Sequence, residues 1–402
     1  MKTIVEINST NYASTGNIML NIAQEARKNG YKVYTFCKAS KESFKYHHED
    51  EFYIGFRKER VLSAVLANLT GLRDHFNLFG TYRLIRKLKE IKPDLIHLHV
   101  LHDDFINTHM FFKYLSKADI PVVWTFHDCC AFTGKCPYFD IVDCQKWKDG
   151  CHNCLQLQIE APSYFFDTTR KIWKQRKTSF TSIKNMTIVT PSVWLSKLVG
   201  QSFFHSYPIT VINNGINLNR FHPIKNDIKK QYQIDNRYLI LGIANVWGKR
   251  KGLDVFIKLA EKLPEDYQIV LVGTNDEIDR QLPKNIISIH RTYNQEELVK
   301  IYSAADLFVN PTREENFPTV NIESLACGTP VLTYATGGSP EIIDKNCGHA
   351  VKKDDFDELL KQITDICENH RYNPEACLKR AAAYDMRDTF SEYVDLYKRI
   401  LS

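Results

Sequence analysis

Two glutamates near the beginning of a predicted helix have the residue type and position for sugar recognition. Glu315 lies in a loop after an apolar strand, and Glu323 lies near the start of the helix that follows. A carboxylate in the loop can accept hydrogen bonds from sugar hydroxyls, and one in the helix can bind a ribose diol. Asn316 and Phe317 add backbone N–H groups at the helix N-terminus, where anions and hydroxyls bind. The alternative is a solvated loop glutamate followed by a capping glutamate.

A run of cations has the composition of a diphosphate site. Lys249, Arg250 and Lys251 lie between Gly248 and Gly252, directly after a predicted strand and before a helix. Cations at this position, beside a helix N-terminus, can bind phosphate oxygens through charge-assisted hydrogen bonds. A solvated basic turn is the alternative.

Glycines in two other loops would let a ligand approach the backbone closely. Gly337 and Gly338 come directly before a predicted helix that has Pro340 in its first turn. Gly16 follows the first predicted strand and could place N–H groups near a phosphate. A simple strand-to-helix turn explains either position equally well.

One histidine also follows a strand directly. His127 comes after the apolar run 121–126, so we expect its side chain at the carboxyl end of that strand. The chain has 14 histidines, and the position of His127 rather than its residue type makes it a candidate.

Four cysteines follow His127 within a short stretch. Cys136, Cys144, Cys151 and Cys154 include one C-x2-C pair, and four thiolates suit a tetrahedral structural zinc. Such a zinc would hold the loop in shape and take no part in catalysis. Reduced cysteines that pack a loop against its domain are the alternative.

Strand and helix patterns alternate along the chain, and these elements must position the candidates. Strands are expected at 3–8, 32–37, 95–101, 121–126 and 186–190, with His97 and His99 on one face of the strand at 95–101. The pattern restarts after about residue 210, with strands at 239–244, 268–272, 286–289, 307–310 and 331–334. This alternation predicts an α/β protein made of parallel βαβ units.

We expect two doubly wound, Rossmann-like domains. The first covers 1–209 and the second covers 210–385, with a linker at 211–223, and a helix over 386–402 crosses back to the first domain. Ligands bind at the carboxyl ends of such parallel strands, so two sheets facing each other would form a cleft for the candidate residues.

Composition limits the classes of protein that fit. Of the 402 residues, 44% are hydrophobic and 25% are charged, which excludes disordered, collagen-like and coiled-coil chains. Apolar runs fall short of the ~18–20 residues that span a bilayer. Glu6 interrupts the first apolar run, so we expect no signal peptide and a cytoplasmic protein in which the 11 cysteines form no disulfide framework. The net charge of +6 suits phosphorylated ligands or an anionic membrane but is too small to predict nucleic-acid binding.

Taken together, these residues resemble the retaining glycosyltransferases of family 4, whose GT-B fold has two Rossmann-like domains. The segment from Glu315 to Glu323 is similar to the family's E-x7-E motif, and A-x-G-x-P-V follows it at 326–331. Further similar segments are 211–217 with Phe221 and Pro223, Lys251-Gly252, 302–311 and Gly337-Gly338. The resemblance covers nearly the whole chain.

The resemblance implies roles for the candidate residues. Glu315 would contact the donor sugar and Glu323 the ribose, while Lys251 would bind the diphosphate. His127 would lie beside the transferred sugar, and Arg291 and Thr292 would lie near the base. The chain departs from the family at Val246, where many members have an arginine, and we expect Arg250 to supply that charge. Its first loop has Gly16 alone where a glycine pair is common.

The implied reaction moves a hexosyl group from a nucleoside-diphosphate sugar to a lipid-linked or saccharide acceptor, with retention, in surface polysaccharide biosynthesis. No Asp-x-Asp follows a strand, so we expect chemistry without a metal or other cofactor. Another GT-B enzyme, such as a sugar-nucleotide epimerase or a phosphorylase, and a non-catalytic binding protein are the alternatives.

Two basic amphipathic stretches, 56–66 and 164–180, could contact the inner membrane peripherally at its cytoplasmic face. Solvated helices packed on a sheet are the alternative.

Overall fold

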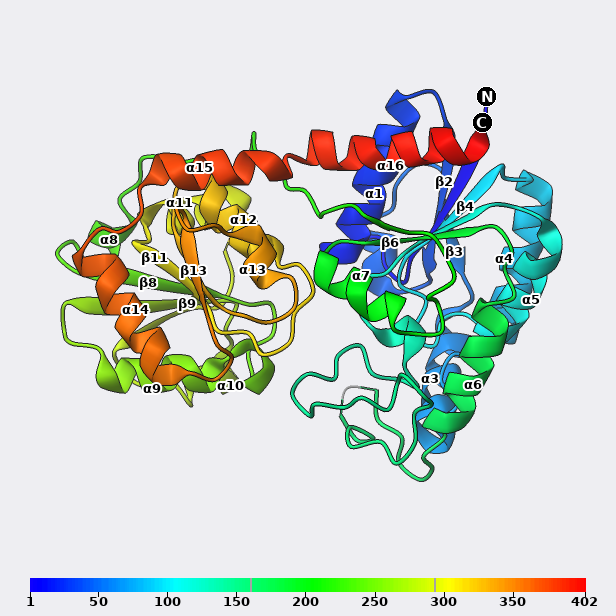
Figure 1. Cartoon of the computed structure of the whole chain (residues 1–402), viewed down its shortest axis with the longest axis horizontal. Coiled ribbons are helices and arrows are strands. Elements are labelled where there is room, and N and C mark those ends of the chain that lie inside the picture. Colours follow the sequence, from blue (N-terminus) through cyan, green and yellow to red (C-terminus); the bar gives the residue numbers. More distant parts are fainter. Residues whose placement is uncertain (160, 293) are drawn as a thin grey trace. The chain divides into compact units, whose positions relative to one another are not determined.

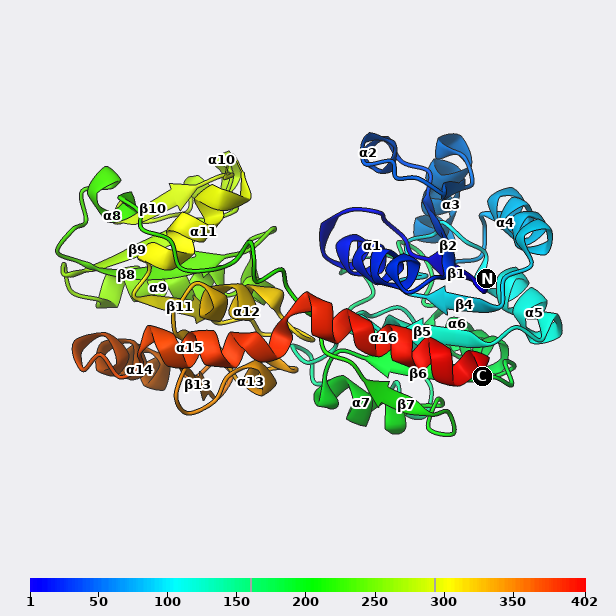
Figure 2. The same cartoon turned by 90° about the horizontal axis from the view of Figure 1, so that it is seen from above.

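The structure of the protein is a computed structural model that describes residues 1–159, 161–292 and 294–402. Contacts within the chain divide it into two compact units. Unit 1 comprises Met1–Asn213 and Thr389–Ser402, and unit 2 comprises Asn214–Asp388. Figures 1 and 2 show the chain from two directions, coloured along the sequence.

Unit 1 is built on a seven-stranded parallel sheet in the order β3-β2-β1-β4-β5-β6-β7. The strands are β1 (Thr3–Ile7), β2 (Lys32–Lys38), β3 (Glu51–Ile54), β4 (Leu95–Leu98), β5 (Val122–Thr125), β6 (Met186–Thr190) and β7 (Ile209–Val211). The helices are α1 (Ala13–Lys28), α2 (Lys41–Lys45), α3 (Arg57–Thr70), α4 (Leu78–Ile91), α5 (Thr108–Ala118), the 3-10 turn η1 (Cys130–Phe132), α6 (Thr169–Phe180), α7 (Val193–Gly200) and most of α16 (Met386–Leu401).

Unit 2 repeats this plan with a six-stranded parallel sheet in the order β10-β9-β8-β11-β12-β13. The strands are β8 (Tyr238–Ile243), β9 (Tyr267–Val272), β10 (Ile286–Ile289), β11 (Leu307–Asn310), β12 (Val331–Tyr334) and β13 (Gly348–Val351). The helices are α8 (Ile228–Gln231), η2 (Lys249–Lys251), α9 (Leu253–Lys262), α10 (Asp276–Asp279), α11 (Gln295–Ala304), α12 (Thr319–Ala326), α13 (Ser339–Ile342), α14 (Phe356–Glu368), α15 (Pro374–Ala381) and η3 (Ala382–Tyr384).

Helices cover both faces of the unit 2 sheet, which is why its strands are apolar along their length. Side chains of α9 and α14, such as Phe256 and Leu359, form one core cluster with the sheet. Side chains of α11 and α12, such as Tyr302 and Ile322, form another. Figure 1 shows these two helix pairs on opposite faces of the sheet. The predicted α/β fold with two doubly wound parallel sheets is confirmed.

Three strands, β3, β7 and β13, are missing from the sequence prediction. Each lies at the edge of its sheet, where it pairs with a single neighbour and needs few apolar residues. Because β7 pairs with β6, unit 1 continues to Asn213 and does not end at residue 209.

The expected loop around Gly16 is wrong. Gly16 lies in the first turn of α1, and a Cβ there would come within 2.8 Å of the backbone carbon of Asn11. Glycine therefore lets the β1–α1 connection fold back against the helix.

Candidate active site

An ion pair joins the basic turn to the loop after β11. The Nζ of Lys251, at the end of η2, lies 2.5 Å from Oε2 of Glu315. Both side chains are mostly buried, at 19% and 13% exposure. Burial opposes the charge of Glu315, but the Lys251 ammonium and the backbone N–H of Asn316 hold its pKa below the ordinary value. Glu315 is therefore a carboxylate at neutral pH.

Arg313 fixes the basic turn on the sheet. Its guanidinium donates to the carbonyl oxygen of Lys249 and pairs with Asp254 at 2.7 Å and Asp354 at 2.6 Å. The backbone N–H of Arg313 donates to the carbonyl of Arg250 at 2.8 Å, and Nη1 of Arg250 donates to the carbonyl of Glu314 at 3.3 Å. These bonds hold η2 and the β11–α12 loop together, and this brings Lys251 to Glu315.

Glu323 lies in the second turn of α12, where it accepts a hydrogen bond from the hydroxyl of Tyr302 at 3.0 Å. Burial raises the pKa of Glu323 to about 7, although hydrogen bonds from Tyr302 and Thr319 oppose that rise. Near neutral pH this carboxyl group therefore exists in both protonation states, and its ionised form can accept hydrogen bonds from a diol.

The Gly337-Gly338 turn packs directly on the Glu315 loop. A Cβ on Gly337 would lie 1.7 Å from the carbonyl oxygen of Glu315, and Gly337 has a φ of +56°. The N–H of Gly338 donates to the carbonyl of Asn316 at 2.7 Å. The structure thus packs two candidate loops against each other at the carboxyl ends of β11 and β12. Their candidate residues are Glu315, Asn316, Gly337 and Gly338.

Other unit 2 candidates lie differently. Phe317 is buried and packs edge-to-face on Tyr384, so only its backbone is available to a ligand at this loop. Arg291 is exposed and Thr292 half-buried after the edge strand β10. That strand is separated from β11 by β9 and β8, and the neighbouring Tyr293 lies outside the described residues.

His127 lies in unit 1, directly after β5 and beside a second histidine. Its Nε2 lies 3.1 Å from Nδ1 of His99, and the two rings stack. Burial and the neighbouring His99 lower the pKa of His127 to about 3, so its imidazole is neutral at physiological pH. Its chemistry there is therefore hydrogen bonding.

A buried polar network supports this histidine pair. Nε2 of His99 lies 3.3 Å from Oε2 of Glu6, and Nδ1 of His97 lies 2.6 Å from the hydroxyl of Tyr397. The hydroxyl of Tyr397 in α16 donates to Glu6 at 3.5 Å. The strand expected at 95–101 ends at Leu98, so His97 lies in β4 and His99 directly follows it, yet their rings lie side by side with centroids 4.1 Å apart. The network ties His127 to β1, β4 and the C-terminal helix.

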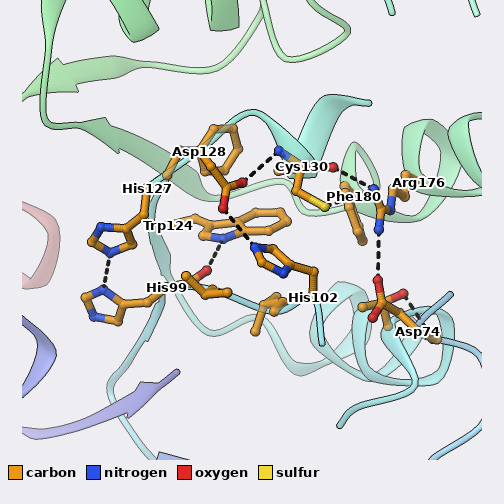
Figure 3. Close-up of a pocket in the computed structure, with 14 residues that line it drawn as sticks. Asp74, His99, His102, Trp124, His127, Asp128, Cys130, Arg176 and Phe180 are labelled. Carbon is orange, nitrogen blue, oxygen red and sulfur yellow. Dashed lines mark hydrogen bonds and ion pairs between the residues drawn. The ribbon is translucent and has the colours of Figure 1, made fainter. Parts of the chain in front are cut away.

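A cavity opens beside His127 within unit 1 (Figure 3). Trp124, Phe126 and Phe180 supply apolar walls, and two ion pairs supply polar ones. Nε2 of His102 lies 2.8 Å from Oδ2 of Asp128, and Arg176 pairs with Asp74 at 2.8 Å. Burial opposes the charge of His102, but the Asp128 carboxylate raises the pKa of this histidine to about 10. Both side chains of the His102–Asp128 pair are therefore charged at neutral pH.

The four cysteines of the proposed zinc site are all half-buried. The Sγ atoms of Cys136 and Cys154 lie 4.0 Å apart, and Cys151 accepts a hydrogen bond from the N–H of Gly134 at 3.1 Å. Within the described ranges, three groups have three or more ligand atoms within 4.8 Å of one another, and these cysteines belong to none of them. The zinc site therefore stays a prediction.

Two residues of the candidate site have no motif that marks them. Arg313 and Glu6 act through contacts with partners far away in the sequence. Two others have a usable signal: Tyr302, which contacts Glu323, begins the family-like segment 302–311, and His99 follows β4 at the carboxyl edge of the sheet, as His127 follows β5.

Solved structures with the same fold include two enzymes of distant sequence. Sucrose-phosphate synthase from Thermosynechococcus elongatus has a TM-score of 0.70 at 16% identity, covering 100% of this chain and 99% of that one. Anabaena HepE in complex with UDP has a TM-score of 0.69 at 16% identity, covering 99% and 100%. These likenesses show the GT-B fold.

Sequence relatives extend along the whole chain. The Escherichia coli (strain K12) protein named as the colanic acid biosynthesis glycosyl transferase WcaC is 22% identical over 400 residues, 95% of this chain and 96% of that protein. A Campylobacter jejuni protein, N,N'-diacetylbacillosaminyl-diphospho-undecaprenol alpha-1,3-N-acetylgalactosaminyltransferase, is 27% identical over 201 residues, 46% of this chain and 53% of that protein.

Two family descriptions match the chain in succession. Residues 224–383 match the family described as glycosyl transferases group 1, and residues 15–220 match glycosyltransferase family 4. Because the second match alone covers more than half of the 402 residues, the chain belongs to glycosyltransferase family 4 and is a glycosyltransferase with the GT-B fold.

Proposed function

We propose that this enzyme transfers a hexosyl group from a nucleoside-diphosphate sugar to a lipid-linked or saccharide acceptor in surface polysaccharide biosynthesis, with retention of the anomeric configuration. The name of the Escherichia coli relative supports the pathway class, and that of the Campylobacter relative supports a polyprenyl diphosphate acceptor. Solved structures of Anabaena HepE with UDP and with UDP-glucose support the donor class. The eleven cysteines, all within the described ranges, are thiols, which supports a cytoplasmic location.

The donor would bind at unit 2, through the turn and loop that Arg313 holds together. Lys251 and Arg250 are the proposed ligands of the diphosphate, and Glu323 is the proposed acceptor of hydrogen bonds from the ribose hydroxyls. Glu315 would accept hydrogen bonds from the transferred sugar. The observation that carries this assignment is the ion pair between Lys251 and Glu315, which sets a cation and a carboxylate side by side where β11 ends.

The proposed step breaks the bond between the anomeric carbon and the diphosphate oxygen. The acceptor oxygen forms its bond on the same face of the sugar, and its proton passes to an oxygen of the departing diphosphate. Negative charge grows on the leaving group in this step, so cations fixed beside it stabilise the transition state more than the ground state. We propose that Lys251 and Arg250 supply this charge without a divalent metal.

His127 would serve as a neutral hydrogen-bond partner of the transferred sugar. Its low pKa rules out a large population of imidazolium, so it orients a hydroxyl and does not stabilise the diphosphate by charge. His99 is a positioning residue for it, since the two ring nitrogens lie 3.1 Å apart.

An assay with a panel of nucleotide sugars tests the proposal. Purified enzyme is incubated with each uridine, guanosine, adenosine and cytidine diphosphate sugar, and release of the nucleoside diphosphate is followed with and without polyprenyl diphosphate-linked acceptors. We expect turnover with one donor. The anomeric configuration of the product, axial or equatorial, should be the same as that of the donor, as read from the anomeric proton coupling by NMR. Inversion of that linkage contradicts the retaining mechanism, and release from none of the donors contradicts the donor class.

A further inference from the structure

Large apolar side chains are exposed on two segments of unit 1. One segment contains Phe56, Val61, Leu62, Val65, Leu69, Leu78, Phe79 and Tyr82, and the other contains Leu155, Ile159, Tyr164, Phe165 and Phe166. We call these residues together the apolar surface. In the described part of unit 2, by contrast, Val246 is the only large apolar side chain that is exposed. Soluble monomers seldom expose contiguous apolar patches of this kind without a partner.

Helix α3 shows that this exposure is built into the fold. Leu62, Val65 and Leu69 follow one another at helical spacing on its outward face, while the residues it buries are Ser63 and Ala67. An ordinary surface helix buries its large apolar residues, because removing them from water stabilises the fold. Because α3 instead turns its small residues inward, its outward face is suited to an apolar environment outside the protein.

Backbone contacts join the second segment to α3. The N–H of Tyr164 donates to the carbonyl of Asn68 at 2.8 Å, and the hydroxyl of Thr168 donates to the carbonyl of Gly71 at 2.6 Å. A Cβ on Gly71 would lie 2.8 Å from the carbonyl oxygen of Phe166, so this glycine permits the close approach. Phe165 and Phe166, which are 71% and 60% exposed, therefore lie beside the end of α3.

Cations accompany the apolar surface. Exposed bases are Arg57 and Lys58 on α3, Arg83 and Arg86 on α4, and Arg170, Lys171, Lys174 and Lys177 on α6. Helix α6 contains no acidic residue. On α3, the carboxylate of Glu59 accepts hydrogen bonds from the N–H groups of Phe79 and Gly80, at 2.8 and 3.1 Å. Arg86 pairs with Glu90 on α4 and Asp167 is exposed next to Phe166, but bases outnumber these acids around the apolar surface.

We propose that the apolar surface docks on an anionic phospholipid bilayer, with its aromatic and aliphatic side chains in the interfacial layer and the bases against lipid phosphates. Bases near such a membrane are attracted by its negative surface potential, and aromatic rings favour the interface. A second copy of the chain would bring the same bases against one another, so charge favours the bilayer over a dimer. None of the helices in the described part of the chain has the length and apolar character of a membrane span.

Sedimentation with vesicles tests this proposal without any sugar nucleotide, so its outcome is separate from that of the proposed reaction. The full chain is mixed with vesicles of phosphatidylcholine alone or with added phosphatidylglycerol. We expect it to sediment with the anionic vesicles and to be released by salt. Absence of binding to the anionic vesicles overturns the proposal.

Two matched variants locate the contact. Val65 on α3 and Val193 on α7 are 48% and 46% exposed, so glutamate at either position disturbs folding to a similar, small extent. We expect Val65→Glu, and likewise Phe165→Glu, to weaken vesicle binding about tenfold or more, since ~1.4 kcal/mol corresponds to a factor of ten. Val193→Glu should bind as the wild type does. Equal binding by Val65→Glu overturns the proposal, as does a wild-type dimer in solution that Val65→Glu dissociates.

Discussion

Lys251 and Glu315 are 64 positions apart in the chain, yet their side chains meet in one ion pair. The proposed role of Lys251 depends on which partner its ammonium group has. Without a donor it pairs with the Glu315 carboxylate, and a bound diphosphate would share or replace that partner. A cation that is already held in place has little reorganisation to undergo when charge develops on the leaving group.

Replacing this cation should reduce turnover more than stability. We expect Lys251→Ala to lower kcat about 10²-fold, the usual cost of removing one such electrostatic contact. The matched control is Lys249→Ala in the same turn, whose side chain is exposed and should change kcat less than about twofold. Steady-state kinetics on the donor found in the panel, with thermal unfolding of each variant, checks this. Equal kcat for folded Lys251→Ala and wild type would remove Lys251 from the site.

Glu323 should make donor binding depend on pH. Its pKa of about 7 means that the carboxylate, the proposed acceptor of hydrogen bonds from the ribose, becomes the major form as pH rises through that value. We therefore expect the KM for the donor to fall by up to about tenfold between pH ~6 and ~8. In Glu323→Gln the KM should be higher and lack this dependence, whereas Glu265→Gln, at an exposed position, should keep it. A pH dependence unchanged in Glu323→Gln would contradict the assignment.

The sequence marks candidate residues for the site but not the contacts that place them. Glu315, Glu323 and Lys251 stand in motifs or after strands, where type and position can be seen in the chain. Arg313 holds the turn through ion pairs with Asp254 and Asp354, and no local sequence pattern predicts partners so distant. Ion pairs of this kind depend on the fold, so they can be predicted only when the positions of η2 and the β11–α12 loop are known.

At the scale of elements, interior strands were predicted and edge strands were mostly missed. Strands β6, β11 and β12 have the predicted bounds, because burial on both faces requires a continuous apolar run. The edge strand β7 is three half-buried residues directly before an Asn-rich stretch that is typical of a linker. Its pairing with β6 is a tertiary contact that its own sequence does not show.

The turn at Gly337 should be intolerant of a side chain. A Cβ would collide with the Glu315 carbonyl at 1.7 Å in a left-handed backbone conformation, so we expect Gly337→Ala to lower the free energy of unfolding by about 1–3 kcal/mol. It should also reduce activity, because Glu315 must move. Gly248→Ala is the control, since an added Cβ there meets no atom within 4 Å. Equal thermal unfolding of the two variants would contradict the proposed packing.

The cysteine loop between η1 and α6 is expected to bind zinc. Cys136, Cys144, Cys151 and Cys154 interact electrostatically with one another, and the 4.0 Å between two of their sulfurs suits neighbouring ligands of one ion. We expect about one zinc per chain by elemental analysis after purification without chelators. Cys154→Ser should lose the metal, while Cys367→Ser, in unit 2, should retain it. If the wild type contains no zinc and these four cysteines react as free thiols, the prediction is contradicted.

At the scale of the whole molecule, the repeated strand–helix pattern made the two doubly wound units predictable. Their boundary depends on β7, whose pairing with β6 carries unit 1 to Asn213. The candidate residues and the apolar surface divide in the same way. Unit 2 holds the ion pair and Glu323, unit 1 holds His127 and the apolar surface, and the C-terminal helix contributes Tyr397 to the network behind His127.

Calorimetric titration of the intact chain with nucleoside diphosphates tests the central claim that unit 2 binds the nucleoside diphosphate of the donor. One of the uridine, guanosine, adenosine and cytidine diphosphates should bind with a stoichiometry of one, and Lys251→Ala should weaken it about tenfold or more while Lys249→Ala does not. If the folded wild-type chain binds none of these nucleotides, or if Lys251→Ala binds as tightly as the wild type, the claim is contradicted.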